Sequence, residues 1–178
     1  MRGIAAFIRL VEAANDRMGR AASWLALATV VICATVVILR YVFSIGLIWL
    51  QDLYVWTHAA VFMLGAAFAL MRNGHVRVDI YYASMSPRGQ AWVEILGFFT
   101  CLVPWIGVLA WLGWPYVAAS WELGEGSAQV GGMPGLFVLK TVILVFCAAI
   151  FLQGLAGVAR AFLLLAGYRG IPAPPAQA

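Results

Sequence analysis

Charge is scarce in this chain. Only 10% of its 178 residues are Asp, Glu, Lys or Arg, whereas 65% are hydrophobic. A soluble domain carries roughly 25% charged residues, so a globule built from this chain would present too apolar a surface to water. The composition therefore argues against a soluble fold and indicates that lipid is the natural solvent.

Cysteine and histidine are also sparse. Cys33, Cys101 and Cys147 lie in different apolar runs without a C-x-x-C pair, which argues against a membrane dithiol oxidoreductase. A haem anchor needs axial ligands within the bilayer, and only His58 lies at that depth. No metal-ligand spacing, nucleophile elbow or phosphate-binding glycine motif is present. We expect no catalytic, cofactor or metal site, and no enzymatic activity.

Acidic residues are missing from the middle of every long apolar run. A carboxylate inside the membrane is the usual mark of an ion pathway, because it is costly to keep there. A stand-alone ion-coupled transporter is therefore hard to build from this chain. Gln153 is polar but neutral, and we expect it to form a hydrogen bond across a helix interface.

Four apolar runs each suit one membrane crossing. We expect helices at about 21–43, 50–71, 90–114 and 136–166, with an outer loop at about 115–135. A run of about 19 residues is roughly 28 Å long as a helix, close to the ~30 Å hydrocarbon thickness. Residues 21–168 are thus predicted to form a four-helix membrane domain, followed by a disordered tail at 169–178.

The first 20 residues have a helical pattern of their own. Ile4, Phe7, Ile8 and Val11 recur at the spacing of one helix face, with charged residues at other positions. We expect residues 1–20 to form a short amphipathic helix in the cytoplasmic interface.

Basic residues fall on one predicted side of the membrane: Arg2, Arg9, Arg17, Arg20, Arg72, Arg77, Arg88 and Arg169. The positive-inside rule places that side in the cytoplasm, so both termini are expected there. Because the basic residues follow topology, they do not imply nucleic acid. The expected fold class is an all-α, multi-pass membrane protein.

A series of short motifs accompanies these spans. They are Arg40-Tyr41-x-Phe43, Trp49-x-x-Asp52, Gly65-Ala66-Ala67, His75-Val76-Arg77-Val78-Asp79, Glu125-x-Ser127 and Gly132-x-Pro134. In order and spacing they resemble the small membrane subunit (DctQ-like) of tripartite ATP-independent periplasmic (TRAP) transporters, over roughly residues 21 to 165. Asp52 departs from the pattern, because the family usually has Glu there.

The resemblance implies a scaffold in the bacterial inner membrane. A periplasmic binding protein would deliver an organic acid to a large permease subunit, which would import it with sodium while this chain braces the permease among the membrane lipids. The candidate assembly residues are Arg40, Trp49, Asp52, Gly65, Arg72, His75, Asp79, Glu125 and Lys140. Arg40 and Asp52 bracket the first outer turn and are expected to pair across it. The alternatives are a membrane anchor of a respiratory or redox enzyme and a stand-alone small transporter.

Overall fold

The computed structural model describes residues 1–75, 79–168 and 170, and only the backbone of residues 79 and 80. Every regular element in this part of the chain is a helix: α1 (Arg2–Tyr41), α2 (Ile48–Met71), α3 (Asp79–Tyr82), α4 (Pro87–Gly97), the π-helical turn η1 (Phe98–Leu102), α5 (Val103–Glu122) and α6 (Leu136–Leu165). Because α4, η1 and α5 follow one another without a break, four helices are long and apolar enough to cross a membrane. The predicted all-α fold with four spans is confirmed.

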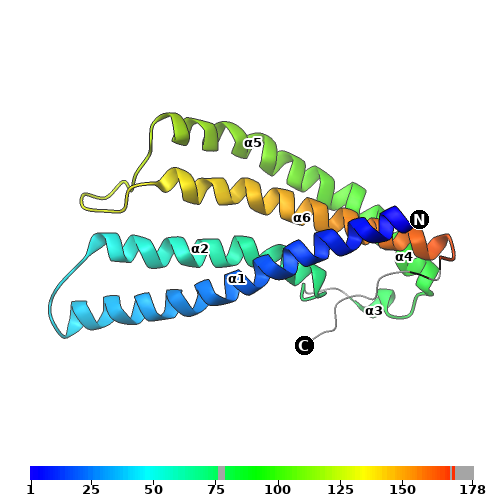
Figure 1. Ribbon diagram of the computed structural model, residues 1–178, viewed down its shortest axis with the longest axis horizontal. Coiled ribbons are helices and arrows are strands. Elements are labelled where there is room, and N and C mark those ends of the chain that lie inside the picture. The colour runs from blue at the N-terminus through cyan, green and yellow to red at the C-terminus, as the bar shows by residue number, and fades with distance from the viewer. Residues whose placement is uncertain (76–78, 169, 171–178) are drawn as a thin grey trace.

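The spans lie side by side in the order α1, α2, α6 and α5 (Figure 1). The central helix is α6, because α1, α2, α4 and α5 all pack against it. Among the described residues, α2 and α5 do not pack closely on each other. We call the end where α1 and α4 begin the N-terminal end, and the end holding residues 42–47 and 123–135 the loop end.

The first helix is longer than predicted, because α1 continues without a break from Arg2 to Tyr41. Its 40 residues span roughly 60 Å, about twice the hydrocarbon thickness. The prediction of a separate short helix over residues 1–20 is therefore corrected. Ile8 and Val11 from its apolar stripe are buried against Ala156 and Leu163 of α6. The amphipathic pattern of this segment thus marks a packing surface within the chain.

The third span also extends beyond its predicted end. Its helix continues through Pro115 to Glu122, so the outer loop covers residues 123–135 instead of 115–135. Proline is tolerated inside membrane helices where the freed backbone groups find other partners. Pro104 lacks an amide hydrogen, and just before it the Val103 amide donates to the Phe98 carbonyl, which produces the π-helical turn.

The interior of the chain is small and centred on α6. One cluster joins Ala67 of α2, Ile106 of α5 and both Cys147 and Ile150 of α6. Glycines allow the closest approaches: a Cβ on Gly154 would lie 2.8 Å from the Phe98 ring, and one on Gly19 would overlap the Phe68 ring. The rest of the span surfaces face outward and are covered by lipid or by another protein.

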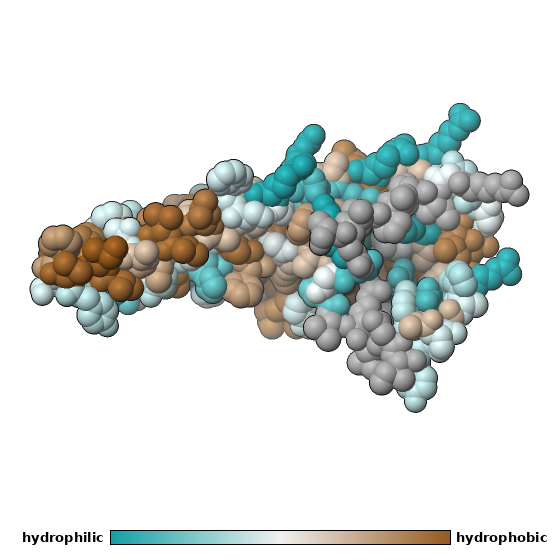
Figure 2. Space-filling model, turned by 90° about the horizontal axis from the view of Figure 1, so that it is seen from below, coloured by the Kyte–Doolittle hydropathy of each residue, from teal (hydrophilic) through white to brown (hydrophobic). Residues whose placement is uncertain are grey.

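Polar and apolar residues separate along the length of the molecule. Figure 2 shows hydrophobic residues over the half toward the loop end and long hydrophilic side chains over the N-terminal end. The exposed arginines of α1 at this end are Arg2, Arg9, Arg17 and Arg20. The molecule therefore has one strongly basic end.

Candidate functional site

Two polar pairs join α1 to α6 inside the apolar bundle. The Asn15 amide nitrogen donates to Gln153 Oε1 at 2.7 Å, and both side chains are buried. One turn further along, Arg160 Nη2 donates to Glu12 Oε1, and the side chains are 21% and 11% exposed. The predicted hydrogen bond of Gln153 across a helix interface is confirmed. These pairs fix the register of α1 on α6, because each polar group needs its partner in a low-dielectric environment.

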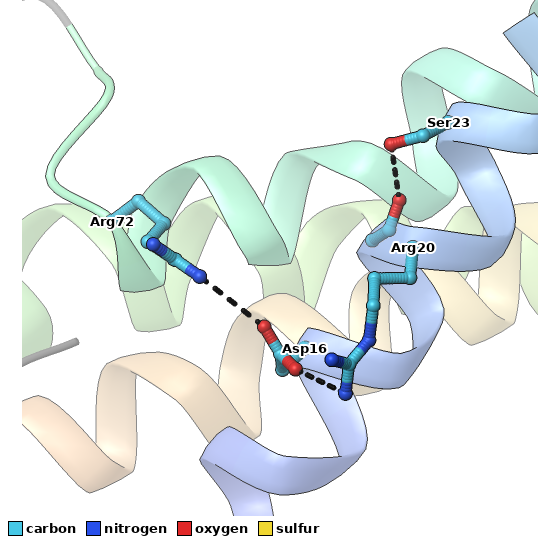
Figure 3. Close-up of polar contacts among 5 residues, drawn as sticks. Asp16, Arg20, Ser23 and Arg72 are labelled. Atoms are coloured by element: carbon cyan, nitrogen blue, oxygen red, sulfur yellow. Dashed lines mark hydrogen bonds and ion pairs between the residues drawn. The ribbon is translucent and has the colours of Figure 1, made fainter. Parts of the chain in front are cut away.

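A third polar contact joins α1 to the end of α2. Asp16 lies between two arginines, Arg20 one turn along α1 and Arg72 just after α2 (Figure 3). Its carboxylate oxygens are 2.5 Å from Arg20 Nη2 and 3.4 Å from Arg72 Nη2. The Arg72 guanidinium also lies over the Phe68 ring, 5.1 Å from its centroid. The ion pair with Asp16 thus joins Arg72 to α1, whereas the cation–π contact with Phe68 lies within the end of α2 itself.

At the loop end, Asp52 joins the start of α2 to the outer loop. Its Oδ2 accepts a hydrogen bond from the Met133 amide at 3.0 Å. Gly132 makes this approach possible, since a Cβ there would lie 2.5 Å from both Asp52 Oδ2 and Ser127 Oγ. The turn itself is closed by the Ser127 amide, which donates to the Met133 carbonyl at 2.9 Å. The motifs at Asp52, Ser127 and Gly132 therefore converge on one contact.

Glu125 and Lys140 join the same loop to α6. Lys140 Nζ lies 2.5 Å from Glu125 Oε2 and 3.9 Å from the centroid of the Tyr116 ring. The hydrogen bond from Lys140 lowers the pKa of the Glu125 carboxyl. Beside it, Trp121 Nε1 donates to Thr141 Oγ1 at 2.8 Å. The outer loop is thus held at both ends, on α2 by Asp52 and on α6 by Lys140.

Because of the Glu125–Lys140 pair, we predict that the stability of the protein depends on pH. A carboxyl whose pKa is lowered on folding stabilises the protein above its ordinary value of 4.5, and this stabilisation is lost as the pH falls through the folded value. We expect the melting temperature of the wild type to exceed that of Glu125→Gln at neutral pH, and the two to converge as the pH falls well below 4.5. Thermal unfolding in detergent across this pH range measures the difference.

Glu122 provides the matched control for this prediction. It is an exposed carboxylate at the end of α5 and forms no ion pair within the described residues. Glu122→Gln is expected to reproduce the wild-type pH profile. If the difference in melting temperature between the wild type and Glu125→Gln stayed constant down to the most acidic sample, the lowered pKa of Glu125 would not be the source of the stabilisation.

The expected pair between Arg40 and Asp52 is not formed. Arg40 is exposed at the end of α1, and the described residues offer it no ion pair. Asp52 accepts instead from the Met133 amide. Six residues separate α1 from α2, and α1 ends in an exposed turn where Ser44 has a positive φ of 57°. The loop amide offers Asp52 a fixed donor, which explains the different partner.

The remaining predicted residues are Trp49, Gly65, His75 and Asp79. Trp49 is exposed at the start of α2, and a Cβ on Gly65 would meet no atom within 4 Å. His75 is exposed just after α2. Asp79 begins α3, but its side chain and all of residues 76–78 lie outside the described residues. The tail predicted at 169–178 also lies outside them, apart from residue 170.

The α1 partners of Gln153 and Arg160 were missed by sequence reasoning, although a signal for them was present. Glu12 and Asn15 are three residues apart, and Gln153 and Arg160 are seven apart, so each pair lies on one helix face. Two polar faces inside otherwise apolar surroundings favour each other as partners. The pairing would have required treating residues 1–20 as part of the bundle.

These contacts join helices of the chain to one another. No group of three His, Cys, Asp or Glu side chains within the described residues is placed to hold a metal ion. His58, the candidate haem ligand, is exposed on α2 and stacks edge-on against Phe62 with 4.8 Å between centroids. The polar groups described above join helices and loops of the chain to one another.

The chain matches a known protein family. A family model described as "Tripartite ATP-independent periplasmic transporters, DctQ component" matches residues 28–164. This range covers most of the chain and includes Asp52, Glu125 and Lys140 together with their partners. It also includes Gln153 and Arg160, whereas their partners Asn15 and Glu12 precede it. Comparison with curated proteins and with solved structures found no match.

Proposed function

The chain belongs to the family of DctQ components of tripartite ATP-independent periplasmic transporters, and from this membership we propose that it braces a large permease subunit during sodium-coupled uptake of organic acids. A periplasmic binding protein would deliver the acid to the permease. The chain is a multi-pass membrane protein and a transporter component. We further propose that it lies in the bacterial inner membrane with both termini in the cytoplasm.

Family membership is the observation that carries this proposal, and the polar contacts support a bracing role. Gln153 and Arg160, the polar residues inside the fourth span, are bonded to α1. A scaffold needs a rigid form to brace a partner, and these bonds supply it. The arginines at the N-terminal end support the cytoplasmic placement, since basic residues gather on that side of a membrane.

The proposal is tested by gentle detergent extraction of the tagged chain from native membranes, followed by mass spectrometry of the proteins that co-purify. A stoichiometric, much larger multi-span protein is the expected result. Uptake of radiolabelled organic acids by the reconstituted complex should then require a sodium gradient and the binding protein. A flavoprotein or iron–sulfur partner would contradict the proposal in favour of a redox anchor, and recovery of the chain alone would contradict a bracing role.

Asp52 gives the proposal a residue-level test. Asp52→Lys removes the acceptor of the Met133 amide and brings a cation to the loop end, so we expect the yield of the complex and its transport rate to fall about tenfold. Substrate preference should stay unchanged, because the substrate site is proposed to lie in the permease. Co-purification and competition uptake assays measure these effects.

The control for this charge reversal is Asp52→Asn. The amide oxygen can still accept from Met133, so assembly should stay within about threefold of the wild type. Wild-type assembly and uptake in Asp52→Lys would remove Asp52 from the assembly residues. We propose that His75 and Asp79 act in the same way at the N-terminal end, where charge reversal of Asp79 should also weaken assembly.

A further inference from the structure

A groove runs along α6 between α2 and the third span. It consists of two adjoining hollows of about 340 and 540 Å³ that share Leu70, Gly97 and Leu102. The groove exists because α2 and α5 both pack on α6 and, among the described residues, not closely on each other. Two glycines in its wall widen the groove: a Cβ on Gly97 or Gly157 would meet no atom within 4 Å.

The groove is polar at one end and apolar along the rest of its length. Glu94 of α4, Arg160 of α6 and Asn73 line the smaller hollow near the N-terminal end. The larger hollow extends to Trp105 and Phe146 and is apolar except at its edge, where His75 lies. A ligand that fits must therefore carry a polar group at one end and a hydrocarbon chain at the other.

The length of the groove distinguishes a lipid from a partner helix. From Glu94 to Trp105 the third span rises roughly 16 Å, which is about half of the ~30 Å hydrocarbon layer. A membrane-spanning helix of a partner would need a groove of the full thickness. One leaflet of lipid, with its headgroup at the polar end, matches both the length and the polarity.

We propose that this groove holds one acyl chain of a zwitterionic, amine-bearing phospholipid, with the lipid phosphate beside Arg160 and its ammonium beside Glu94. The two residues provide one charge of each sign at the polar end, which complements a headgroup with a phosphate and an amine. Arg160 binds Glu12 through Nη2 and lines the smaller hollow, and a guanidinium carries five N–H donors, so it can bind a phosphate as well as Glu12.

The test is to purify the full chain with any protein partner in mild detergent and to quantify the retained phospholipids by mass spectrometry. The wild type should keep a stoichiometric amount of phosphatidylethanolamine after detergent exchange. Gly157→Leu fills the groove, and retained lipid should fall about tenfold or more. Gly107→Leu is the matched control, because Gly107 is also open and helical but lies outside the groove; it should retain lipid as the wild type does.

Two further measurements keep the proposal falsifiable if Gly157→Leu does not fold. Glu94→Gln should shift the retained lipid from phosphatidylethanolamine toward phosphatidylglycerol, and an unchanged ratio would overturn the headgroup assignment. A photo-crosslinking amino acid at position 157 should capture lipid in native membranes. Capture of a partner protein there, or a wild type purified without stoichiometric phospholipid, would overturn the proposal, and neither result depends on which transporter the chain serves.

Discussion

Replacing Arg160 by Met is expected to lower the free energy of unfolding by about 3–5 kcal/mol, because the Glu12 carboxylate would be left without its cation between α1 and α6. Glu12 is only 11% exposed, so water can replace the guanidinium only in part. The loss should appear in unfolding of the purified chain in mixed micelles. Complex formation should weaken in parallel, since α1 loses a contact that fixes its register.

Glu12→Met combined with Arg160→Met provides the decisive comparison. Removing both charges leaves an apolar contact of similar volume, and such replacements are often neutral. The double variant should therefore lie within about 1 kcal/mol of the wild type. Arg20→Met controls for arginine loss in general: Arg20 is 70% exposed and should cost about 0.5 kcal/mol or less. Equal losses in the single and double variants would mean that the pair is not the source of the effect.

Gly132→Ala is the second substitution with a large expected effect. The new Cβ would lie 2.5 Å from Asp52 Oδ2 and from Ser127, so the outer loop must move away from α2. We expect a loss of about 1–3 kcal/mol from overpacking, together with loss of the bond from the Met133 amide to Asp52. Thermal unfolding and limited proteolysis within residues 123–135 measure the two effects.

The same loop offers a control for this glycine. A Cβ on Gly126 would meet its nearest atoms at 3.6 Å, an ordinary van der Waals distance, so Gly126→Ala should behave as the wild type. In an Asp52→Ala background, Gly132→Ala should cost measurably less, because one of the two obstacles is gone. Strict additivity of the two substitutions would show that Gly132 does not act through Asp52.

The four spans could be predicted because side chains that face lipid are predominantly apolar, which produces long apolar runs in the sequence. Each apolar run had to form a helix, since the bilayer offers no partner for free backbone groups. The ends were harder to predict. The third span was predicted to end at about residue 114, but its helix continues through Pro115 to Glu122, because a proline inside a membrane helix is tolerated when neighbouring groups compensate.

The contacts between distant segments could be predicted only in part. A polar residue such as Gln153 requires a partner in the bilayer, so its interhelical bond could be anticipated, although Asn15 could not be named. The partner of Asp52 was beyond reach, because it is a backbone amide 81 positions away. Because every residue except proline carries a backbone amide, the residue types do not reveal which amide will be the donor. The groove could not be predicted either, since it depends on α2 and α5 packing on α6 without packing closely on each other within the described part of the chain.

The central position of α6 also bears on how the chain is made. Synthesis proceeds from the N-terminus, so α6 is the last span to leave the ribosome, yet α1, α2, α4 and α5 all pack on it. Until α6 has been made, Glu12 and Asn15 lack Arg160 and Gln153, their partners on that helix. A chain truncated before α6 keeps these polar groups uncovered, and a membrane protease can recognise it as unfinished.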